Sequence, residues 1–109
     1  MNLVELPVLN IQTIQSKLTP LFKKYQVKSA YLFGSYARGE AIESSDVDIR
    51  IDKGNSPYLE ALLDVAGCEL DITDTLKKPV HLLTHIPQDE YSFIFRKNLA
   101  KDEVKIYGI

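Results

Sequence analysis

The sequence has few of the residues that indicate a special environment. A single cysteine, Cys68, excludes an internal disulfide and a Cys-x-x-Cys metal site, and its apolar neighbours predict a small buried side chain. No apolar run approaches the roughly 20 residues that cross a membrane. The first ten residues lack the basic start and apolar core of a signal peptide. We therefore expect a soluble, cytoplasmic protein with no membrane contact.

An excess of charge of one sign is also missing. The chain has 13 Lys and Arg against 15 Asp and Glu, a formal net charge of -2, so no global field attracts nucleic acid. We expect no direct nucleic-acid binding, and we interpret Lys77-Lys78 as a helix end or a solvated loop. With 109 residues, 45% hydrophobic and 26% charged, the composition is that of one globular domain over residues 1–109.

Helical and strand patterns alternate along the chain. Helical spacing extends from Ile11 to Tyr25, as one helix kinked at Pro20 or as two, and we favour one. Further elements are strands at 27–33, 46–51 and 79–84, a helix after the Ser56-Pro57 cap reaching about Leu76, a helix over 89–99, and an ending that is a strand or a helical turn. These elements predict an α/β (α+β) domain, with a short mixed sheet of three to four strands flanked by helices.

The apolar pattern also predicts which helix faces point inward. For the middle helix the inward residues are Leu59, Leu62, Leu63, Ala66 and Leu70. For the last helix they are Tyr91, Ile94, Phe95 and Leu99.

Two carboxylates stand two residues apart on the strand at 46–51. Asp46 and Asp48 share one face with alpha carbons about 6–7 Å apart, and they repel each other unless a cation lies between them. Mg²⁺ suits such a pair, because it prefers oxygen ligands and is commonly held by one or two carboxylates plus substrate phosphates. An Asp-x-Asp pair alone is also common on exposed strands, so the neighbouring residues must decide.

Gly34-Ser35, which ends the strand at 27–33, supplies that context. Glycine lets a phosphate approach closely, and the start of a helical turn presents free N–H groups. The Arg38 guanidinium can bind phosphate oxygens. The alternatives are a simple strand-ending turn and a surface ion pair of Arg38 with Glu40 or Glu43. Together the two segments predict a site for a nucleoside triphosphate with Mg²⁺.

The stretch GSYARGEAIESSDVDI resembles the signature of the nucleotidyltransferases related to polymerase beta, and especially the minimal nucleotidyltransferases. The matching residues are Gly34, Ser35, Ala37, Arg38, Gly39, Ser45, Asp46, Asp48 and Ile49. The resemblance implies that nucleotide phosphates bind at Gly34, Ser35, Arg38 and Ser45. It also implies that Asp46 and Asp48 bind Mg²⁺, and that AMP moves from ATP to an acceptor hydroxyl.

The chain departs from this family at the third carboxylate. The family usually has an aspartate on the third strand, where the stretch VHLLT places His81. His81 is a candidate general base or a lost catalytic position, and a two-histidine metal site with His85 is a further alternative. Asp52 lies about 13 Å along its strand from Asp48, too far to share its metal. Asp71 and Asp74 belong to the preceding helix and are not placed by sequence alone, whereas Glu40 and Glu43, in the loop before the pair, are not excluded as the third carboxylate.

Three functions remain open. The resemblance implies an antitoxin that neutralises a partner HEPN-domain ribonuclease toxin, by transferring AMP from ATP to a toxin tyrosine. A chain with a weakened site could instead act by binding alone, or as a nucleotide-binding regulatory subunit. A partner face could include Tyr91, Phe93, Phe95 and Tyr107, although core packing also explains most of them.

Overall fold

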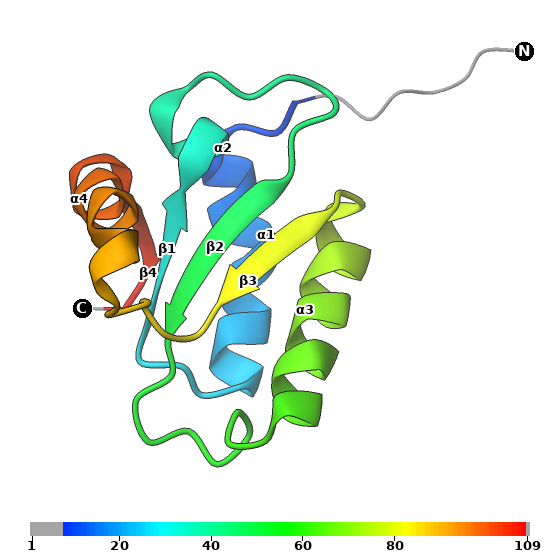
Figure 1. Cartoon of the computed structure of the whole chain (residues 1–109). Coiled ribbons are helices and arrows are strands. Elements are labelled where there is room, and N and C mark those ends of the chain that lie inside the picture. Colours follow the sequence, from blue (N-terminus) through cyan, green and yellow to red (C-terminus); the bar gives the residue numbers. More distant parts are fainter. Residues whose placement is uncertain (1–7, 109) are drawn as a thin grey trace, which may run out of the picture.

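A computed structural model describes residues 8–108 (Figure 1). The elements in chain order are α1 (Ile11–Lys24), β1 (Ser29–Phe33), α2 (Gly34–Arg38), β2 (Val47–Asp52), α3 (Leu62–Leu76), β3 (Val80–Leu83), a 3-10 turn η1 (Glu90–Ser92), α4 (Phe93–Asp102) and β4 (Val104–Tyr107). The sheet order is β3-β2-β1-β4. β1 pairs antiparallel with β2 and β4, and β2 pairs parallel with β3. The predicted α+β domain with a mixed sheet is confirmed, and the ending is a strand.

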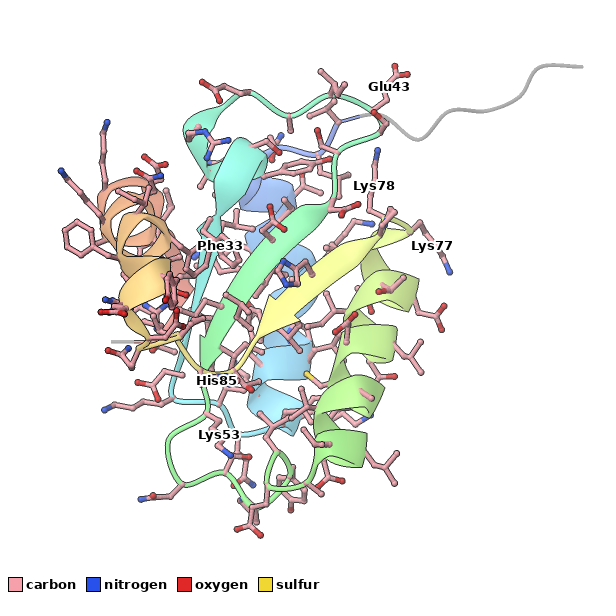
Figure 2. The ribbon with its side chains drawn as sticks, in the orientation of Figure 1. Phe33, Glu43, Lys53, Lys77, Lys78 and His85 are labelled. Carbon is pink, nitrogen blue, oxygen red and sulfur yellow. The ribbon has the colours of Figure 1, made fainter. Side chains whose placement is uncertain are left out.

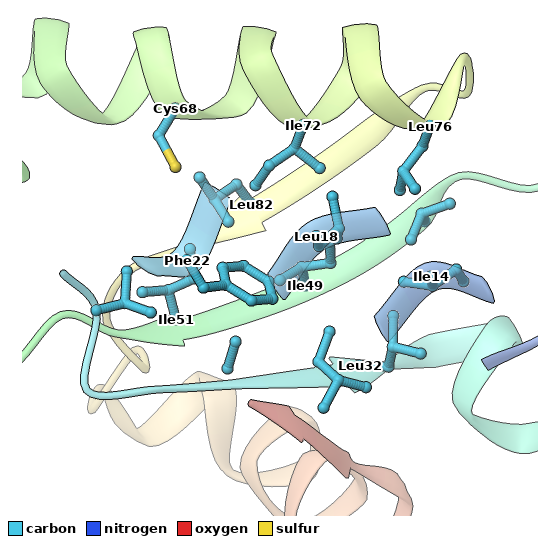
Figure 3. Packing of buried hydrophobic residues seen from close by; sticks show 14 of the residues in the cluster. Ile14, Leu18, Phe22, Leu32, Ile49, Ile51, Cys68, Ile72, Leu76 and Leu82 are labelled. Atoms are coloured by element: carbon cyan, nitrogen blue, oxygen red, sulfur yellow. The ribbon is translucent and has the colours of Figure 1, made fainter. Parts of the chain in front are cut away.

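α1 and α3 cover one face of the sheet (Figure 1). α1 is a single helix despite Pro20, and the Asn10 side chain caps it by accepting from the Thr13 N–H at 2.7 Å. Between the helices and the sheet lies the core (Figure 3), which includes Ile14, Leu18, Phe22, Leu32, Ile49, Ile51, Cys68, Ile72, Leu76 and Leu82. The burial predicted for Cys68 is confirmed.

β2 alternates as its sequence predicts. Val47, Ile49 and Ile51 are buried against the helices, while Asp48 and Arg50 lie on the other face. On this second face, which we call the open face, α4 contacts the sheet through Phe95 on Phe33. The Asp48 and Arg50 side chains on this face are only partly exposed.

α3 differs from its prediction in both start and orientation. It begins at Leu62, where the Asp64 carboxylate accepts from the Ala61 N–H at 3.2 Å. Ser56 does not cap a helix, because its hydroxyl donates to the Tyr25 carbonyl and accepts from the Tyr58 N–H. Leu59 is buried, but it lies in the loop before α3.

The inward face of α3 is formed by Cys68, Ile72 and Leu76. The predicted inward residues were wrong: Leu62 is 89% exposed and Leu63 is 85% exposed, and Ala66 and Leu70 are also exposed. Both sets of residues have helical spacing, so periodicity alone could not choose between them.

α4 also turns a different side inward. Leu99 is buried as predicted, and the Phe95 ring packs edge-on against Phe33 at 6.1 Å between centroids. Tyr91 and Ile94 were wrongly predicted to face inward, because they are 89% and 62% exposed. The entry to α4 is held by Arg96, whose guanidinium donates to two backbone carbonyls of the preceding loop. Among residues 8–108, no helix combines the length and apolarity needed to cross a bilayer.

Candidate active site

The Gly34-Ser35 turn lies directly against Asp48. Gly34 follows β1 with a φ of +68°, which places it in the left-handed region. A Cβ built at this glycine would lie 2.2 Å from the Asp48 Oδ2 atom. Only glycine therefore permits this approach. The structure thus brings together the two segments that the sequence assigned to phosphate and metal.

Asp48 is a half-buried carboxylate on the open face, and Asp46 is exposed just before β2. Burial raises the pKa of Asp48 above its ordinary value, and the negative charge of Asp46 adds to that rise. The adjacent His81 and, more weakly, the Arg38 charge lower the pKa but do not cancel the rise. The Asp48 carboxylate is therefore a group whose charge is costly in the free protein. A bound cation would offset that cost.

His81 faces Asp48 across the parallel pair of β2 and β3. The two residues are register partners, and the His81 Nδ1 atom is 3.4 Å from the Asp48 Oδ1 atom. The His81 ring lies at 6.1 Å from that of Phe33, edge to face. The residue at the position of the missing aspartate is thus part of the site geometry.

His85 is not part of this arrangement. β3 ends at Leu83, so the strand does not extend to His85, which Figure 2 shows beyond the end of β3. Among residues 8–108, no three His, Cys, Asp or Glu side chains are grouped to hold a metal ion. Carboxylates of this kind fit a cation that takes its other ligands from nucleotide phosphates and water.

Arg38 and Ser45 make contacts within the protein. The Arg38 Nε atom donates to Glu40 at 2.8 Å, as one alternative predicted, and its Nη1 atom is 3.5 Å from the Asp102 carboxylate. The Arg38 side chain stays 41% exposed in these pairs, and ion pairs at the surface contribute little to stability. The Ser45 hydroxyl accepts from the Ile42 N–H at 2.9 Å and so shapes the loop before Asp46. The nucleotide roles of both residues stay predictions.

Lys78 also supports the loop before Asp46, and it lies just after the end of α3, as one of its two sequence interpretations predicted, but it is not solvated. It is only 4% exposed, and its ammonium donates to the Glu43 carbonyl at 3.1 Å (Figure 2). A helix-end lysine normally keeps its charge in solvent, so sequence alone gave no signal for this anchor. The contact ties the end of α3 to the loop that leads into the aspartate pair.

The sequence also gave no signal for a bidentate ion pair on the open face. The Arg50 guanidinium donates two hydrogen bonds of 3.0 and 2.9 Å to the Glu103 carboxylate, and it stacks 4.2 Å from the Tyr31 ring centroid. Alternation placed Arg50 on the same face as Asp48, but nothing local identified Glu103. The pair fastens β2 to the start of β4.

Comparison with known proteins agrees with this geometry. The family model described as "Polymerase beta, Nucleotidyltransferase" matches residues 16–108. A protein of Methanocaldococcus jannaschii that carries the name of a protein adenylyltransferase is 39% identical over 77 residues. These residues are 71% of this chain and 80% of that protein. The fold and the family match define a nucleotidyltransferase. The chain belongs to the polymerase beta nucleotidyltransferase family.

Solved structures share the fold at low identity. One is a toxin–antitoxin complex with AMP-PNP, with a TM-score of 0.69, 18% identity, and coverage of 87% of this chain and 73% of the other. Another is a tri-AMPylated Shewanella oneidensis HEPN toxin with its MNT antitoxin, with a TM-score of 0.64, 16% identity, and coverage of 91% and 73%. At these identities the similarity establishes the fold alone.

Proposed function

We propose that the chain is an antitoxin that transfers AMP from ATP to a tyrosine hydroxyl of a HEPN ribonuclease toxin. The observation that carries the proposal is the close approach of the Gly34 turn to Asp48, which supports a site where N–H groups bind phosphate beside a carboxylate that binds metal. The relative named as an adenylyltransferase supports the reaction class. The structural neighbour with an AMPylated HEPN toxin supports the kind of partner.

Each group of the site has a role in this reaction. The N–H groups of Gly34-Ser35 and the Arg38 guanidinium hold the phosphates, and Asp46 and Asp48 hold a divalent cation, for which Mg²⁺ is the usual choice with nucleotides. Such a cation offsets the charge that develops on the phosphates. The tyrosine oxygen forms a bond to the α-phosphorus of ATP. The bond between the α-phosphorus and the oxygen that bridges to the β-phosphate breaks, and pyrophosphate leaves. His81, exposed beside Asp48, accepts the tyrosine proton.

A docking surface for the toxin lies beside the site. Tyr91 in η1, and Phe93 and Ile94 at the start of α4, are exposed apolar residues, and we call them the α4 patch. Phe95 links this helix to Phe33, which in turn contacts His81. A partner covering the α4 patch would bring its acceptor near the site. Two other residues of the proposed partner face pack internally, Phe95 on Phe33 and Tyr107 on Phe22.

Intact mass spectrometry of the toxin tests the reaction. With ATP and a divalent cation, we expect the toxin to gain the mass of one or more AMP residues, and the gain to disappear with Asp46→Asn/Asp48→Asn. Asp52→Asn is the matched control, since Asp52 is also on β2 but at its far end, and it should leave the gain intact. An unchanged toxin mass, measured alongside an active control enzyme, would contradict AMP transfer.

Neutralisation by binding alone is the second candidate, and it is favoured by His81 at the position of the third carboxylate. The same double variant separates the two functions. If Asp46→Asn/Asp48→Asn still neutralises the toxin, binding is sufficient. If it forms the complex but no longer neutralises, chemistry is required. Tight ATP binding without product or a toxin complex would instead indicate a regulatory subunit.

A further inference from the structure

A second apolar stripe follows the solvent side of α3. Leu62, Ala66 and Leu70 are exposed at intervals of four residues, and Leu63, three residues before Ala66, is exposed on the same face. We call these four residues the α3 stripe. The inward side of α3 has its own apolar residues, which Figure 3 shows pointing from the helix into the core. α3 is therefore apolar on two sides, and in the described part of the chain only the inward side is covered.

A helix with this pattern is suited to a position between two layers of protein. Amphipathic surface helices normally have one apolar side and one polar side, and helices that are apolar on every side are buried. Single exposed leucines are common, whereas adjoining exposed apolar residues indicate an interaction surface. Leu62 is 89% exposed, Leu63 is 85% exposed and Leu70 is 69% exposed. The stripe thus presents three almost complete leucine side chains to a partner.

The charges around the α3 stripe restrict what that partner is. Residues 54–76 contain no Lys or Arg and five acids, which are Glu60, Asp64, Glu69, Asp71 and Asp74. Helical geometry places Glu69 and Asp74 on opposite sides of Leu70. Within residues 8–108, neither of these two carboxylates is in an ion pair, whereas Asp71 is paired with Lys24. The stripe is therefore bordered by negative charge that is available to cations.

Two kinds of occupant are disfavoured by this border. A second copy of the chain would bring its own acidic border against that of the first copy, and like charges that face each other weaken an interface. An anionic lipid surface would be repelled for the same reason. A partner with an apolar centre and basic edges is complementary in both respects.

We propose that the α3 stripe binds an amphipathic helix of a partner protein, whose apolar side faces the leucines and whose Lys or Arg side chains border it. An apolar helix face of this kind recognises another helix through side chains spaced three, four and seven residues apart. The inference goes beyond the proposed function, because α3 covers the sheet face opposite to the one that carries Asp48. Figure 1 shows α3 and α4 at opposite edges of the molecule, so a partner held on the stripe leaves both the site and the α4 patch accessible.

A synthetic peptide serves as the probe. It has about 18 residues, or about five helical turns, with leucines on one face, lysines and arginines on the other, and a fluorescent label for anisotropy titrations. A scrambled peptide of the same composition lacks the apolar face, and an acidic peptide has glutamates in place of the basic residues. We expect the protein to bind the basic amphipathic peptide at least about tenfold more tightly than either of these.

Substitutions on the stripe locate the binding surface. We expect Leu63→Ser/Leu70→Ser to lower the affinity for the basic amphipathic peptide at least about tenfold, because the apolar contacts are lost. Ile42→Ser is the matched control: Ile42 is 63% exposed but lies in the loop before β2, so the affinity should be unchanged. If Leu63→Ser/Leu70→Ser does not fold, Glu69→Gln/Asp74→Asn keeps the leucines, and it should lower both the affinity and its dependence on salt.

Three results would overturn the proposal. The first is equal binding of the amphipathic and scrambled peptides, or no binding of either. The second is full affinity in the folded stripe variants. The third is a dimer of the free chain in sedimentation experiments that Leu63→Ser/Leu70→Ser dissociates, because a second copy would then cover the stripe. These measurements use neither ATP nor toxin, so their outcome is independent of whether AMP transfer is found.

Discussion

At the scale of single residues, Gly34 has a demanding position beside the candidate site. It combines a φ of +68° with a backbone that touches the Asp48 carboxylate. Gly39, at the other end of α2, has a similar φ of +74°, but a Cβ there would meet nothing within 4 Å. Both glycines have a positive φ, but only at Gly34 would an added side chain meet the Asp48 carboxylate.

We expect Gly34→Ala to cost more than Gly39→Ala and to remove nucleotide binding. Both variants place a side chain at positive φ, at a cost of about 1 kcal/mol or more each. Only Gly34→Ala must also displace Asp48. Urea denaturation and nucleotide titration measure the two effects. Equal losses of stability with retained binding in Gly34→Ala would show that the close approach is unimportant.

Tyr36 is a second residue with an unusual environment. Within residues 8–108, its hydroxyl is the buried side-chain oxygen or nitrogen that has no hydrogen-bond partner. We expect Tyr36→Phe to be neutral or to stabilise the fold by up to about 1–2 kcal/mol, since the desolvation cost of that hydroxyl disappears. Chemical denaturation checks this. A clear destabilisation would reveal a partner for the hydroxyl.

At the scale of secondary-structure elements, the strands were easier to predict than the helices. The alternation in β2 identifies its buried face, because successive side chains of a strand point to opposite faces and the apolar set is the one that is buried. In α3 two apolar sets compete, Leu62, Ala66 and Leu70 against Cys68, Ile72 and Leu76. Both have helical spacing, and tertiary packing decides between them. The same limit explains the exposed Tyr91, which lies in η1 just before α4.

The site shows a similar division. The motif from Gly34 to Asp48 is local, so its spacing identified both halves of the site. His81 was found only because the resemblance marks its position. Lys78 and the Arg50–Glu103 pair were missed, because their partners are 35 and 53 residues away in sequence. No local pattern reports contacts of that range.

Paired substitutions in α3 test which side of that helix is buried. We expect Ile72→Ala to destabilise by about 2–5 kcal/mol through the cavity that it leaves. Leu70→Ala should change stability by less than about 0.5 kcal/mol, because Leu70 is 69% exposed. Urea denaturation of the two variants gives the comparison. A larger loss in Leu70→Ala would mean that another surface covers this side of α3.

At the scale of the whole molecule, Cys68 reports on the integrity of the core. It lies on α3 against the sheet, and burial raises the pKa of its thiol to about 12. Because the thiolate is the reactive form, a raised pKa keeps the native thiol protonated and inert at neutral and mildly alkaline pH. Unfolding restores the ordinary pKa and exposes the sulfur.

We therefore expect thiol reagents to modify Cys68 only when the domain opens. In mildly alkaline buffer the native protein should react far more slowly than the protein in urea, and the modified fraction should follow the unfolding curve. Ile72→Ala should speed the reaction in native buffer, since it weakens the packing around α3. Rapid modification of the native wild type would contradict the buried position.

The parallel pairing of β2 with β3 has a consequence for the order of folding. β1 and β2 are antiparallel neighbours in the sequence, whereas β3 reaches β2 only after the chain has crossed through α3. Such a non-local pairing forms late, because the intervening segment must be ordered first. Asp48 and His81 therefore meet only in the completed sheet. A ligand that contacts both residues would bind the native state and not a partly folded form without β3, and would stabilise the docking of the third strand.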